Sequence, residues 1–309
     1  MSVLVISREQ LSPKLVAMFG SQIPDTEFRL WPDVGDPAAV EYALAWHPPA
    51  GELARLPNLK AILSFAAGVD HLGSDPQLPK HIPVVRAVSE ASRLTMSGFC
   101  VAQVLRYQHR LALYESFQRQ GQWKQVPPRD MSETRVGVLG MGVLGADLAQ
   151  RLIALGFTVN GWARSPRQVE GVGMFHGADG LTACLRASNV VVCLLPLTAQ
   201  TYGILNAEAF AAMPREGYVI NVARGGHVVV PDLIAALDSG HLEGATLDVF
   251  DPEPLPAESP LWRHPRIVVT PHTSGRMTNQ RVAMNILAML REVLSGKKLD
   301  NVVDWSKGY

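Results

Sequence analysis

Short apolar runs alternate with helix-like segments from Val3 to Val88. This alternation predicts parallel strands joined by helices, because a parallel neighbour cannot be reached through a tight hairpin. The runs and segments are Val3–Ile6, Leu11–Phe19, Phe28–Trp31, Ala43–Trp46, Gly51–Leu56, Ala61–Phe65 and Val84–Val88.

The region from Ser89 to Trp123 loses strand signals, and its apolar residues recur at helical spacing. One or two long helices are expected there, with room for a crossing between domains. After the polar, Pro-containing stretch Val126–Glu133, strand and helix signals alternate again, and a last helix with one apolar face is expected over Asn279–Leu294. The second series is Arg135–Leu139, Ala146–Leu155, Thr158–Ala163, Val190–Leu194, Ala207–Met213, Tyr218–Val222, Leu233–Leu237, Ala245–Val249 and Ile267–Thr270.

Length and composition favour a two-domain globular protein. A chain of 309 residues exceeds what one small core usually encloses, so we expect two α/β domains with doubly wound parallel sheets. Hydrophobic residues make up 47% of the chain and charged residues 18%, which excludes an intrinsically disordered scaffold. Basic and acidic residues cancel at 28 each, which disfavours nucleic-acid or anionic-membrane binding and favours a small-molecule partner.

The cysteines indicate a reducing environment. Cys100, Cys184 and Cys193 are odd in number, lack CxxC spacing and lie within apolar segments, so they are expected to be reduced core residues. The short run Val3–Ile6 is followed at once by charged residues, and nowhere are 18 consecutive residues apolar, which supports neither export nor membrane spanning. A cytoplasmic location is therefore expected.

A glycine motif follows the first apolar run of the second series. In this motif the first glycine permits a tight turn, the second lets backbone approach a pyrophosphate, and the third lets the helix pack on the strand. The helix amino terminus adds N–H groups and a positive dipole. This context predicts a dinucleotide site rather than an ordinary glycine-rich turn. The motif is Gly140, Met141, Gly142, Val143, Leu144 and Gly145.

The next strand, Thr158–Ala163, indicates which dinucleotide is bound. An acid that would hydrogen-bond the ribose hydroxyls is missing, since no Asp or Glu lies between Gln150 and Val169. Arg164, Ser165 and Arg167 stand there instead, and guanidiniums with a hydroxyl suit a 2′-phosphate. NADP(H) is therefore preferred as the cofactor, with a solvated basic turn as the alternative.

Three further segments carry a family resemblance: Asn221–Gly225, Leu247–Pro254 and Thr270–His272. They resemble the signatures of the D-isomer-specific 2-hydroxyacid dehydrogenases. Together with Ser64–Asp70, Leu194–Thr198 and the glycine motif, the resemblance covers nearly the whole chain in the family's order. Trp46–Pro49 and Trp162–Ser165 are most similar to the glyoxylate/hydroxypyruvate reductase A branch.

The resemblance implies reduction of small 2-oxo acids such as glyoxylate and hydroxypyruvate to 2-hydroxy acids, and the chemistry of three residues supports it. Arg224 would bind the carboxylate and the developing oxyanion, and His272 would act as the acid and base. Glu253 would keep His272 protonated until the hydride arrives. Taken singly, each could be an ordinary surface or packing residue, but each follows an apolar strand, and ligands of open α/β sheets collect at the carboxyl ends of strands.

Further contacts are implied by the resemblance alone. Backbone N–H groups around Gly68 and Val69 would hold the substrate carboxylate, and Trp46 would line the substrate pocket. An ordinary turn glycine and a strand-end core tryptophan are the alternatives for Gly68 and Trp46. The residues implied to lie along the cofactor are Pro196, Thr198 and Asp248, the last at the carboxamide side of the nicotinamide.

The family also implies the domain organisation. A Rossmann domain (97–275) would be inserted into a flavodoxin-like substrate domain (1–96 and 276–309), with the active site in the cleft. The helices of Ser89–Trp123 resemble the family's dimer arm, so a homodimer is expected. A nucleotide-sensing interaction protein of the same fold, like the C-terminal-binding-protein corepressors, is the alternative.

No metal is expected. Apart from His272, the histidines show no HExxH motif and no paired metal-ligand spacing with one another or with cysteine. They are His47, His71, His81, His109, His176, His227, His241 and His264.

Overall fold

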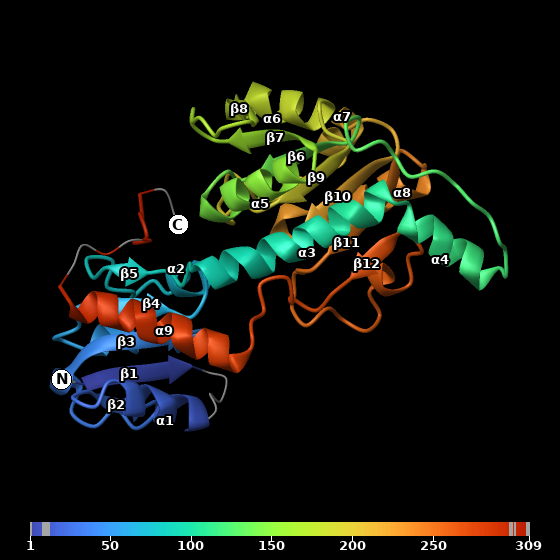
Figure 1. Cartoon of the computed structure of the whole chain (residues 1–309). Coiled ribbons are helices and arrows are strands. Elements are labelled where there is room, and N and C mark those ends of the chain that lie inside the picture. The colour runs from blue at the N-terminus through green and yellow to red at the C-terminus, as the bar shows by residue number, and fades with distance from the viewer. Residues whose placement is uncertain (1, 8–12, 297–298, 300, 307–309) are drawn as a thin grey trace. The chain divides into compact units, whose positions relative to one another are not determined.

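The computed structural model describes residues 2–7, 13–296, 299 and 301–306. They form two compact units: unit 1 contains the described residues up to Ser92 and from Met277 onward, and unit 2 runs from Arg93 to Arg276 (Figure 1). Each unit has its own sheet, and all strand pairs within the two sheets are parallel. The prediction of two parallel-sheet α/β domains is confirmed.

Unit 1 has the strand order β2-β1-β3-β4-β5, which is the flavodoxin-like order. Helices α1 (Pro13–Gln22) and α9 (Asn279–Leu294) contact each other on one face of this sheet (Figure 1). The opposite face is covered by a short 3₁₀ turn, Leu53–Arg55, and by α2 (Asp70–Gly73). The strands are β1 (Ser2–Ser7), β2 (Glu27–Leu30), β3 (Val40–Trp46), β4 (Ala61–Ser64) and β5 (Val84–Val85).

Strand alternation divides the core of unit 1 between the two faces. Val3 and Val5 pack with the helical cover of α1 and α9, whereas Leu4 and Ile6 pack with Leu72 on the other face. A strand buried on both faces reads as a continuous apolar run, which is why the sequence pattern identified these strands. The expected helix Leu11–Phe19 begins at Leu11, which lies outside the described residues.

Unit 2 has the strand order β12-β11-β10-β9-β6-β7-β8. Counted from β6 this is the Rossmann order 3-2-1-4-5-6 with one more strand at the edge. The order reverses between β6 and β9, and such a switch point opens a crevice at the carboxyl ends of the strands. The strands are β6 (Arg135–Leu139), β7 (Thr158–Ala163), β8 (Gly173–His176), β9 (Val190–Cys193), β10 (Gly217–Asn221), β11 (Leu242–Leu247) and β12 (Ile267–Val269).

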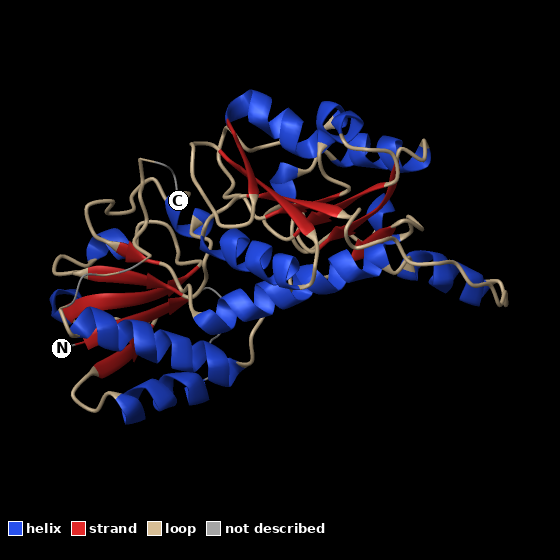
Figure 2. Ribbon diagram, turned by 45° about the horizontal axis from the view of Figure 1, so that its top comes forward, coloured by secondary structure: helices blue, strands red, loops and turns tan. Residues whose placement is uncertain are grey.

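Helices cover both faces of the second sheet (Figure 2). Val190 and Val192 of β9 pack into the core that includes residues of α3 and α5, whereas Val191 and Cys193 pack into the core that includes residues of α6, α7 and α8. The helices are α3 (Glu90–Gln108), α5 (Val143–Ala154), α6 (Gly177–Arg186), α7 (Ala207–Ala212) and α8 (Val230–Asp238).

The region Ser89–Trp123, for which one or two long helices were predicted, contains two helices. After α3, the chain turns at Arg110, whose φ of 54° is left-handed, and α4 (Leu111–Arg119) follows. The pair β8 and α6 had no counterpart in the sequence prediction. Strand β8 is a short edge strand whose residues are exposed or half-buried, so it lacks the apolar run that marks a central strand.

All three cysteines are buried and unpaired. Burial raises the pKa of the Cys184 and Cys193 thiols to about 12, so both are neutral thiols at physiological pH. Within the described ranges, no helix has the length and apolar character needed to cross a membrane.

Candidate active site

The candidate residues of unit 2 all follow the carboxyl ends of its parallel strands. The glycine motif follows β6 and Arg164 follows β7, while the segment around Pro196 follows β9. Arg224, Asp248 and His272 follow β10, β11 and β12. Because parallel strands end at one edge of the sheet, these segments gather there despite their separation in sequence.

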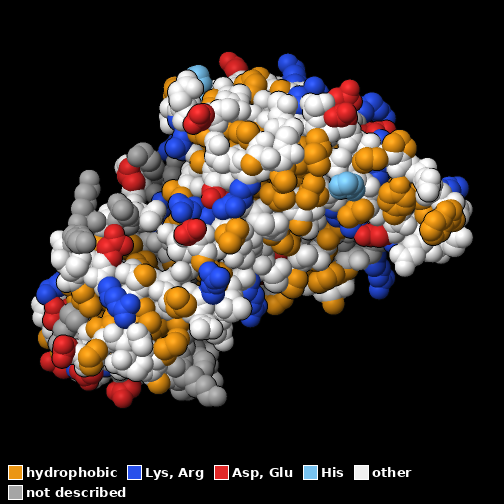
Figure 3. Space-filling model, in the orientation of Figure 1, with side chains coloured by type: hydrophobic (Ala, Val, Ile, Leu, Met, Phe, Trp, Pro, Cys, Tyr) orange, Lys and Arg blue, Asp and Glu red, His pale blue; other side chains and the backbone are white. Residues whose placement is uncertain are grey.

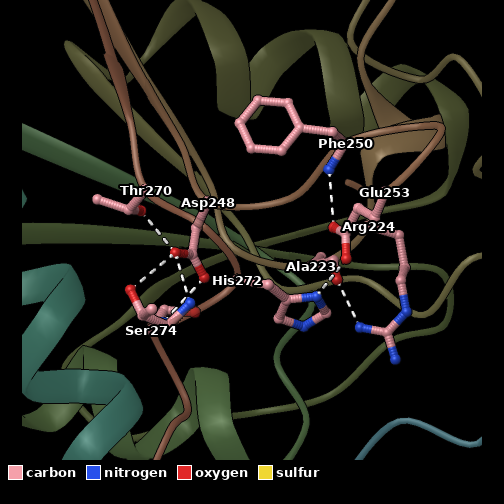
Figure 4. A network of polar contacts seen from close by, with 9 residues as sticks. Ala223, Arg224, Asp248, Phe250, Glu253, Thr270, His272 and Ser274 are labelled. Carbon is pink, nitrogen blue, oxygen red and sulfur yellow. Dashed lines mark hydrogen bonds and ion pairs between the residues drawn. The ribbon is translucent and has the colours of Figure 1, made fainter. Parts of the chain in front are cut away.

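His272 and Glu253 form a hydrogen-bonded pair at this edge (Figure 4). His272 Nδ1 lies 2.8 Å from Glu253 Oε2, and Glu253 Oε1 accepts a hydrogen bond of 2.9 Å from the Phe250 N–H. The side chains are 46% and 36% exposed, and an ion pair this open adds little to the stability of the fold. Its geometry is nevertheless useful for proton transfer, because engaging Nδ1 leaves Nε2 as the ring atom that can exchange a proton with a ligand.

The buried carboxylate of Asp248 holds the segment that carries His272. Its Oδ1 accepts from Thr270 Oγ1 at 2.5 Å and from the Thr273 N–H at 2.9 Å, and its Oδ2 accepts from the Ser274 N–H at 2.9 Å (Figure 4). The Asp248 carbonyl accepts the His272 N–H at 2.8 Å. His272 has a left-handed φ of 52°, a conformation that needs such fixing in a residue other than glycine. Asp248 thus positions His272, and its implied contact with the nicotinamide stays a prediction.

Arg224 is half-buried and lies on a turn fixed by its neighbours. Its guanidinium Nη1 donates to the Ala223 carbonyl at 2.6 Å (Figure 4), and the Asn221 side-chain amide donates to the Arg224 carbonyl at 2.8 Å. These bonds hold the backbone of Arg224 at the end of β10.

Gly225 brings the Arg224 turn against the segment that leads to Glu253. A Cβ atom at Gly225 would lie 2.0 Å from the carbonyl carbon of Phe250 and 2.4 Å from the Asp251 nitrogen. Both neighbours are backbone atoms, so no side-chain rotation could make room for a larger residue. Only glycine permits this backbone approach, which brings together the segments of Arg224 and Glu253.

The glycine motif has the geometry needed for a dinucleotide. Gly140 has a φ of 101°, and a Cβ atom there would lie 2.7 Å from the Leu194 carbonyl oxygen. A Cβ atom at Gly145 would lie 2.1 Å from the Gly140 carbonyl oxygen, so α5 packs directly on the turn. For Gly142, no described atom beyond its immediate neighbours lies within 4 Å of the same position, and no side chain of the described chain caps α5. A pyrophosphate would fit this open, uncapped helix terminus.

The other residues of the motif differ in exposure. Met141 is 1% exposed and its side chain belongs to the core, whereas Val143 is 43% exposed. Leu144 is half-buried. Contacts from Met141 to a cofactor would therefore use its backbone.

Arg164, Ser165 and Arg167 are exposed at the end of β7. Arg164 Nη1 donates to Gln200 Oε1 at 3.1 Å in the segment after β9, and Arg167 donates to the Met141 carbonyl in the glycine motif. The two guanidiniums therefore flank the carboxyl ends of β6 and β9. Their charge, with no acid between Gln150 and Val169, suits a 2′-phosphate.

The segment after β9 has its own internal bonds. Thr201 Oγ1 donates to the Pro196 carbonyl at 2.7 Å and accepts the Thr198 N–H at 2.8 Å. These bonds fix the turn that contains Pro196 and Thr198. The turn lies beside the glycine motif, because the Leu194 N–H donates to the carbonyl of Leu139, the residue before Gly140, at 2.8 Å.

The expected substrate-binding residues of unit 1 lie at the carboxyl edge of its own sheet. Trp46 is the last residue of β3, and its ring centroid lies 4.8 Å from that of His71 in α2. Gly68 and Val69 lie just before α2, where Val69 is 4% exposed and belongs to the core. The role of Gly68 and Val69 toward a ligand would therefore fall to the backbone.

Two residues of the site were missed from the sequence. Thr201 organises the segment of Pro196, and the buried His227 contacts both this segment and Arg224. The one available signal for His227 was its position three residues after Arg224, a spacing that short helical turns bring together. Across the described ranges, no group of three or more His, Cys, Asp or Glu side chains is arranged to hold a metal ion.

Comparison with known proteins identifies the class. Residues 101–274 match the family model of the D-isomer specific 2-hydroxyacid dehydrogenase NAD binding domain. The chain belongs to the D-isomer specific 2-hydroxyacid dehydrogenases, as its motifs predicted. A dehydrogenase of this family from Xanthobacter autotrophicus Py2, solved with NADPH and MES, is 41% identical with a TM-score of 0.93 over 100% of this chain and 99% of that one.

Within the class, the similar proteins include reductases of one kind. "Glyoxylate/hydroxypyruvate reductase A" of Photorhabdus laumondii is 41% identical over 294 residues, covering 93% of each chain. That of Yersinia enterocolitica is 38% identical over 295 residues, covering 94% of each. The NADPH-dependent glyoxylate/hydroxypyruvate reductase of Sinorhizobium meliloti, solved with NADP and sulfate, is 36% identical with a TM-score of 0.89 over 100% of this chain and 99% of that one. These relatives do not support the corepressor-like alternative.

Substituting Gly225 by alanine should separate the two segments that meet there. The added Cβ cannot fit against the Phe250 and Asp251 backbone, so the Arg224 turn must move. We expect Gly225→Ala to lower the turnover of 2-oxo acids about a hundredfold, because a shift of about 1 Å at a reacting group costs about that much. Steady-state kinetics and thermal unfolding would measure the two effects.

Gly98→Ala is the matched control. Gly98 is exposed in α3, and no described atom outside its own helix backbone and chain neighbours would lie within 4 Å of its Cβ. Alanine is more favourable than glycine inside a helix by about 1 kcal/mol. This variant should therefore keep the wild-type activity, and its Tm should be unchanged or higher. Wild-type turnover in Gly225→Ala would contradict the proposed importance of the backbone contact.

Proposed function

We propose that this chain is an NADPH-dependent reductase that converts small 2-oxo acids, glyoxylate and hydroxypyruvate, into 2-hydroxy acids. The observation that carries the proposal is the Glu253–His272 pair beside the Arg224 turn. Carbonyl reduction needs a proton donor, a carboxylate that keeps this donor charged and a cation for the substrate, and His272, Glu253 and Arg224 supply them in that order. The names of the reductase relatives and the NADPH and NADP complexes of the solved ones support it.

Arg224 binds the substrate carboxylate through its planar guanidinium and stabilises negative charge on the carbonyl oxygen. His272 Nε2 donates a proton to that oxygen, while Glu253 on Nδ1 stabilises the charged imidazolium. Bound NADPH supplies the hydride for the carbonyl carbon. In the reverse direction His272 removes the proton of the 2-hydroxy group.

We assign substrate contacts in unit 1 to Trp46 and to the N–H groups of Gly68 and Val69. In unit 2 the pyrophosphate is held by the glycine motif and the amino terminus of α5, and the 2′-phosphate by Arg164 and Ser165 with Arg167. Pro196, Thr198 and Asp248 complete the cofactor site. Unit 1 is thus the substrate domain and unit 2 the cofactor domain.

The activity is tested by following NADPH absorbance with glyoxylate, hydroxypyruvate, pyruvate and a bulky 2-oxo acid. We expect turnover with the first two to exceed that with the bulky acid. His272→Gln should lower kcat by about 10² to 10⁴, the usual contribution of general acid catalysis, while NADPH binding stays near the wild-type level. A variant that kept more than about a tenth of wild-type kcat would remove His272 from its role.

The cofactor preference is tested by the double substitution Arg164→Ala with Ser165→Ala. Charge-assisted hydrogen bonds to the 2′-phosphate would be lost, so KM for NADPH should rise at least about tenfold while KM for NADH barely changes. Arg186→Ala, which removes an equal charge from the exposed end of α6, is the control and should change neither value. Equal use of NADH and NADPH by the wild type would contradict the assignment.

A homodimer is proposed from the surface of α4 and the segment after it. No residue of α4 is buried within the described chain, although Leu111, Tyr114 and Phe117 lie on it, and Trp123 is 93% exposed. Figure 3 shows hydrophobic side chains gathered at the right-hand end of the molecule, over these elements. Tyr114, Phe117 and Trp123 also line a hollow of about 500 Å³, which suits a second copy of the chain.

Sedimentation should give twice the 33.6 kDa mass of one chain. Phe117→Ser should shift it toward the monomer, because a polar side chain would replace the aromatic ring at the interface. A wild-type protein that sediments as a monomer at micromolar concentration would contradict the dimer.

A cytoplasmic location is proposed from the cysteines. Three buried thiols without a disulfide are typical of reducing compartments. Fractionation of cells should recover the chain with cytosolic markers, and recovery in an oxidising compartment would overturn this assignment.

A further inference from the structure

His227 is a buried histidine that joins two parts of the candidate site. It is 0% exposed and ends the 3₁₀ turn Gly225–His227, directly after Arg224. Its Nδ1 lies 3.2 Å from the Arg224 backbone nitrogen, and its Nε2 lies 3.3 Å from the Pro196 carbonyl oxygen. One imidazole ring therefore connects the turn of the substrate-binding arginine with the segment along the cofactor site.

The surrounding groups select one tautomer of His227. The Pro196 carbonyl oxygen can only accept, so Nε2 carries the proton, and the lone pair of Nδ1 accepts the Arg224 N–H. Nδ1 also lies 3.1 Å from the Arg224 carbonyl oxygen, but a proton on Nδ1 would leave the Nε2 lone pair facing the Pro196 oxygen. The neutral ring with Nε2–H makes both bonds.

His241, a half-buried histidine of the same unit, makes a different set of contacts. His241 Nε2 lies 2.9 Å from the Phe210 carbonyl oxygen and 3.1 Å from the Met213 carbonyl oxygen. Both acceptors belong to the end of a single helix, α7, away from the candidate site. His227 instead uses its two nitrogens on two separate segments, and each segment carries a residue assigned to a ligand.

Other bonds support the same connection. The Gly203 N–H donates to the Gly226 carbonyl at 2.8 Å, and the Leu205 N–H donates to the His227 carbonyl at 2.9 Å. Thr201 Oγ1 shares the Pro196 carbonyl with His227. The backbone of the turn is therefore attached to the cofactor segment further along, and the His227 ring adds the link nearest to Arg224 itself.

We propose that His227 is a positioning residue with two separable functions: its Nδ1 fixes Arg224 for the 2-oxo acid, and its Nε2 fixes the Pro196 segment for NADPH. This inference rests on the proposed function, because it names the ligands by that reaction. In this proposal the ring acts through the backbone atoms that it holds, the Arg224 nitrogen and the Pro196 carbonyl oxygen.

Two substitutions separate the two bonds. In His227→Asn, the short side chain keeps an oxygen near the position of Nδ1 but has no donor that reaches Pro196. In His227→Gln, the longer side chain keeps an N–H near the position of Nε2 but has no acceptor for the Arg224 N–H. His241→Gln is the matched control, because it changes a half-buried histidine of the same unit away from the site.

Calorimetry on the full-length protein would measure Kd for NADPH and, in the presence of NADP⁺, Kd for oxamate, a 2-oxo acid mimic that is not reduced. One lost hydrogen bond corresponds to about a five- to tenfold change in Kd. We expect His227→Gln to raise Kd for oxamate by that factor with Kd for NADPH within twofold of wild type, and His227→Asn to show the reverse. His241→Gln should change neither.

Parallel losses of both affinities in both variants, or no loss in either, would overturn the proposal, because a merely structural histidine gives no crossed pattern. The tautomer gives a second measurement that needs no variant: ¹⁵N NMR of the wild-type ring should show Nε2–H, and an Nδ1–H ring would also overturn it. Both affinities are measured without turnover. A wild-type protein that is inactive would contradict the proposed function, but the loss of one affinity in each variant could still be measured.

Discussion

The buried carboxylate of Asp248 is the interaction on which the arrangement of the site depends. A buried charge is costly unless it is fully hydrogen-bonded, and this one obtains its donors from Thr270, Thr273 and Ser274. Satisfying the carboxylate therefore forces the chain after β12 into one path. On that path His272 takes its left-handed conformation and faces Glu253. The stability of unit 2 and the placement of His272, its proposed proton donor, are thus linked through one side chain.

The fold was largely predictable because parallel strands are buried on both faces. Runs such as Val190–Cys193 are apolar throughout, and their β-branched residues leave little ambiguity about strand structure. The edge strand β8 was missed for the opposite reason, since an edge strand is partly open to solvent and its sequence GMFH carries a weak signal. The position of the break between α3 and α4 was not predicted either. Arg110 has a left-handed φ there, and arginine is not one of the residue types that usually indicate this conformation.

The site was predictable where a motif states its chemistry. The glycines after β6 and the three residues Arg224, Glu253 and His272 were predicted in this way, and the structure shows close backbone contacts at Gly140, Gly145 and Gly225. His227 was overlooked because its partners, the Arg224 N–H and the Pro196 carbonyl, are known only from the structure. In the sequence alone it resembles any core histidine. Thr201 was missed for the same reason, as a hydroxyl that holds a turn carries no signature in the sequence.

The position of all this chemistry at one edge of each sheet has a consequence for how such a protein can change over generations. Turns at the opposite edge, such as those at Gly156 before β7 and Gly240 before β11, reverse the chain and carry none of the candidate site residues. Drift at the carboxyl edge can therefore alter which acid or which cofactor is preferred, while the amino edge and the strands between preserve the fold. A new specificity can arise by exchanging loops without rebuilding the core.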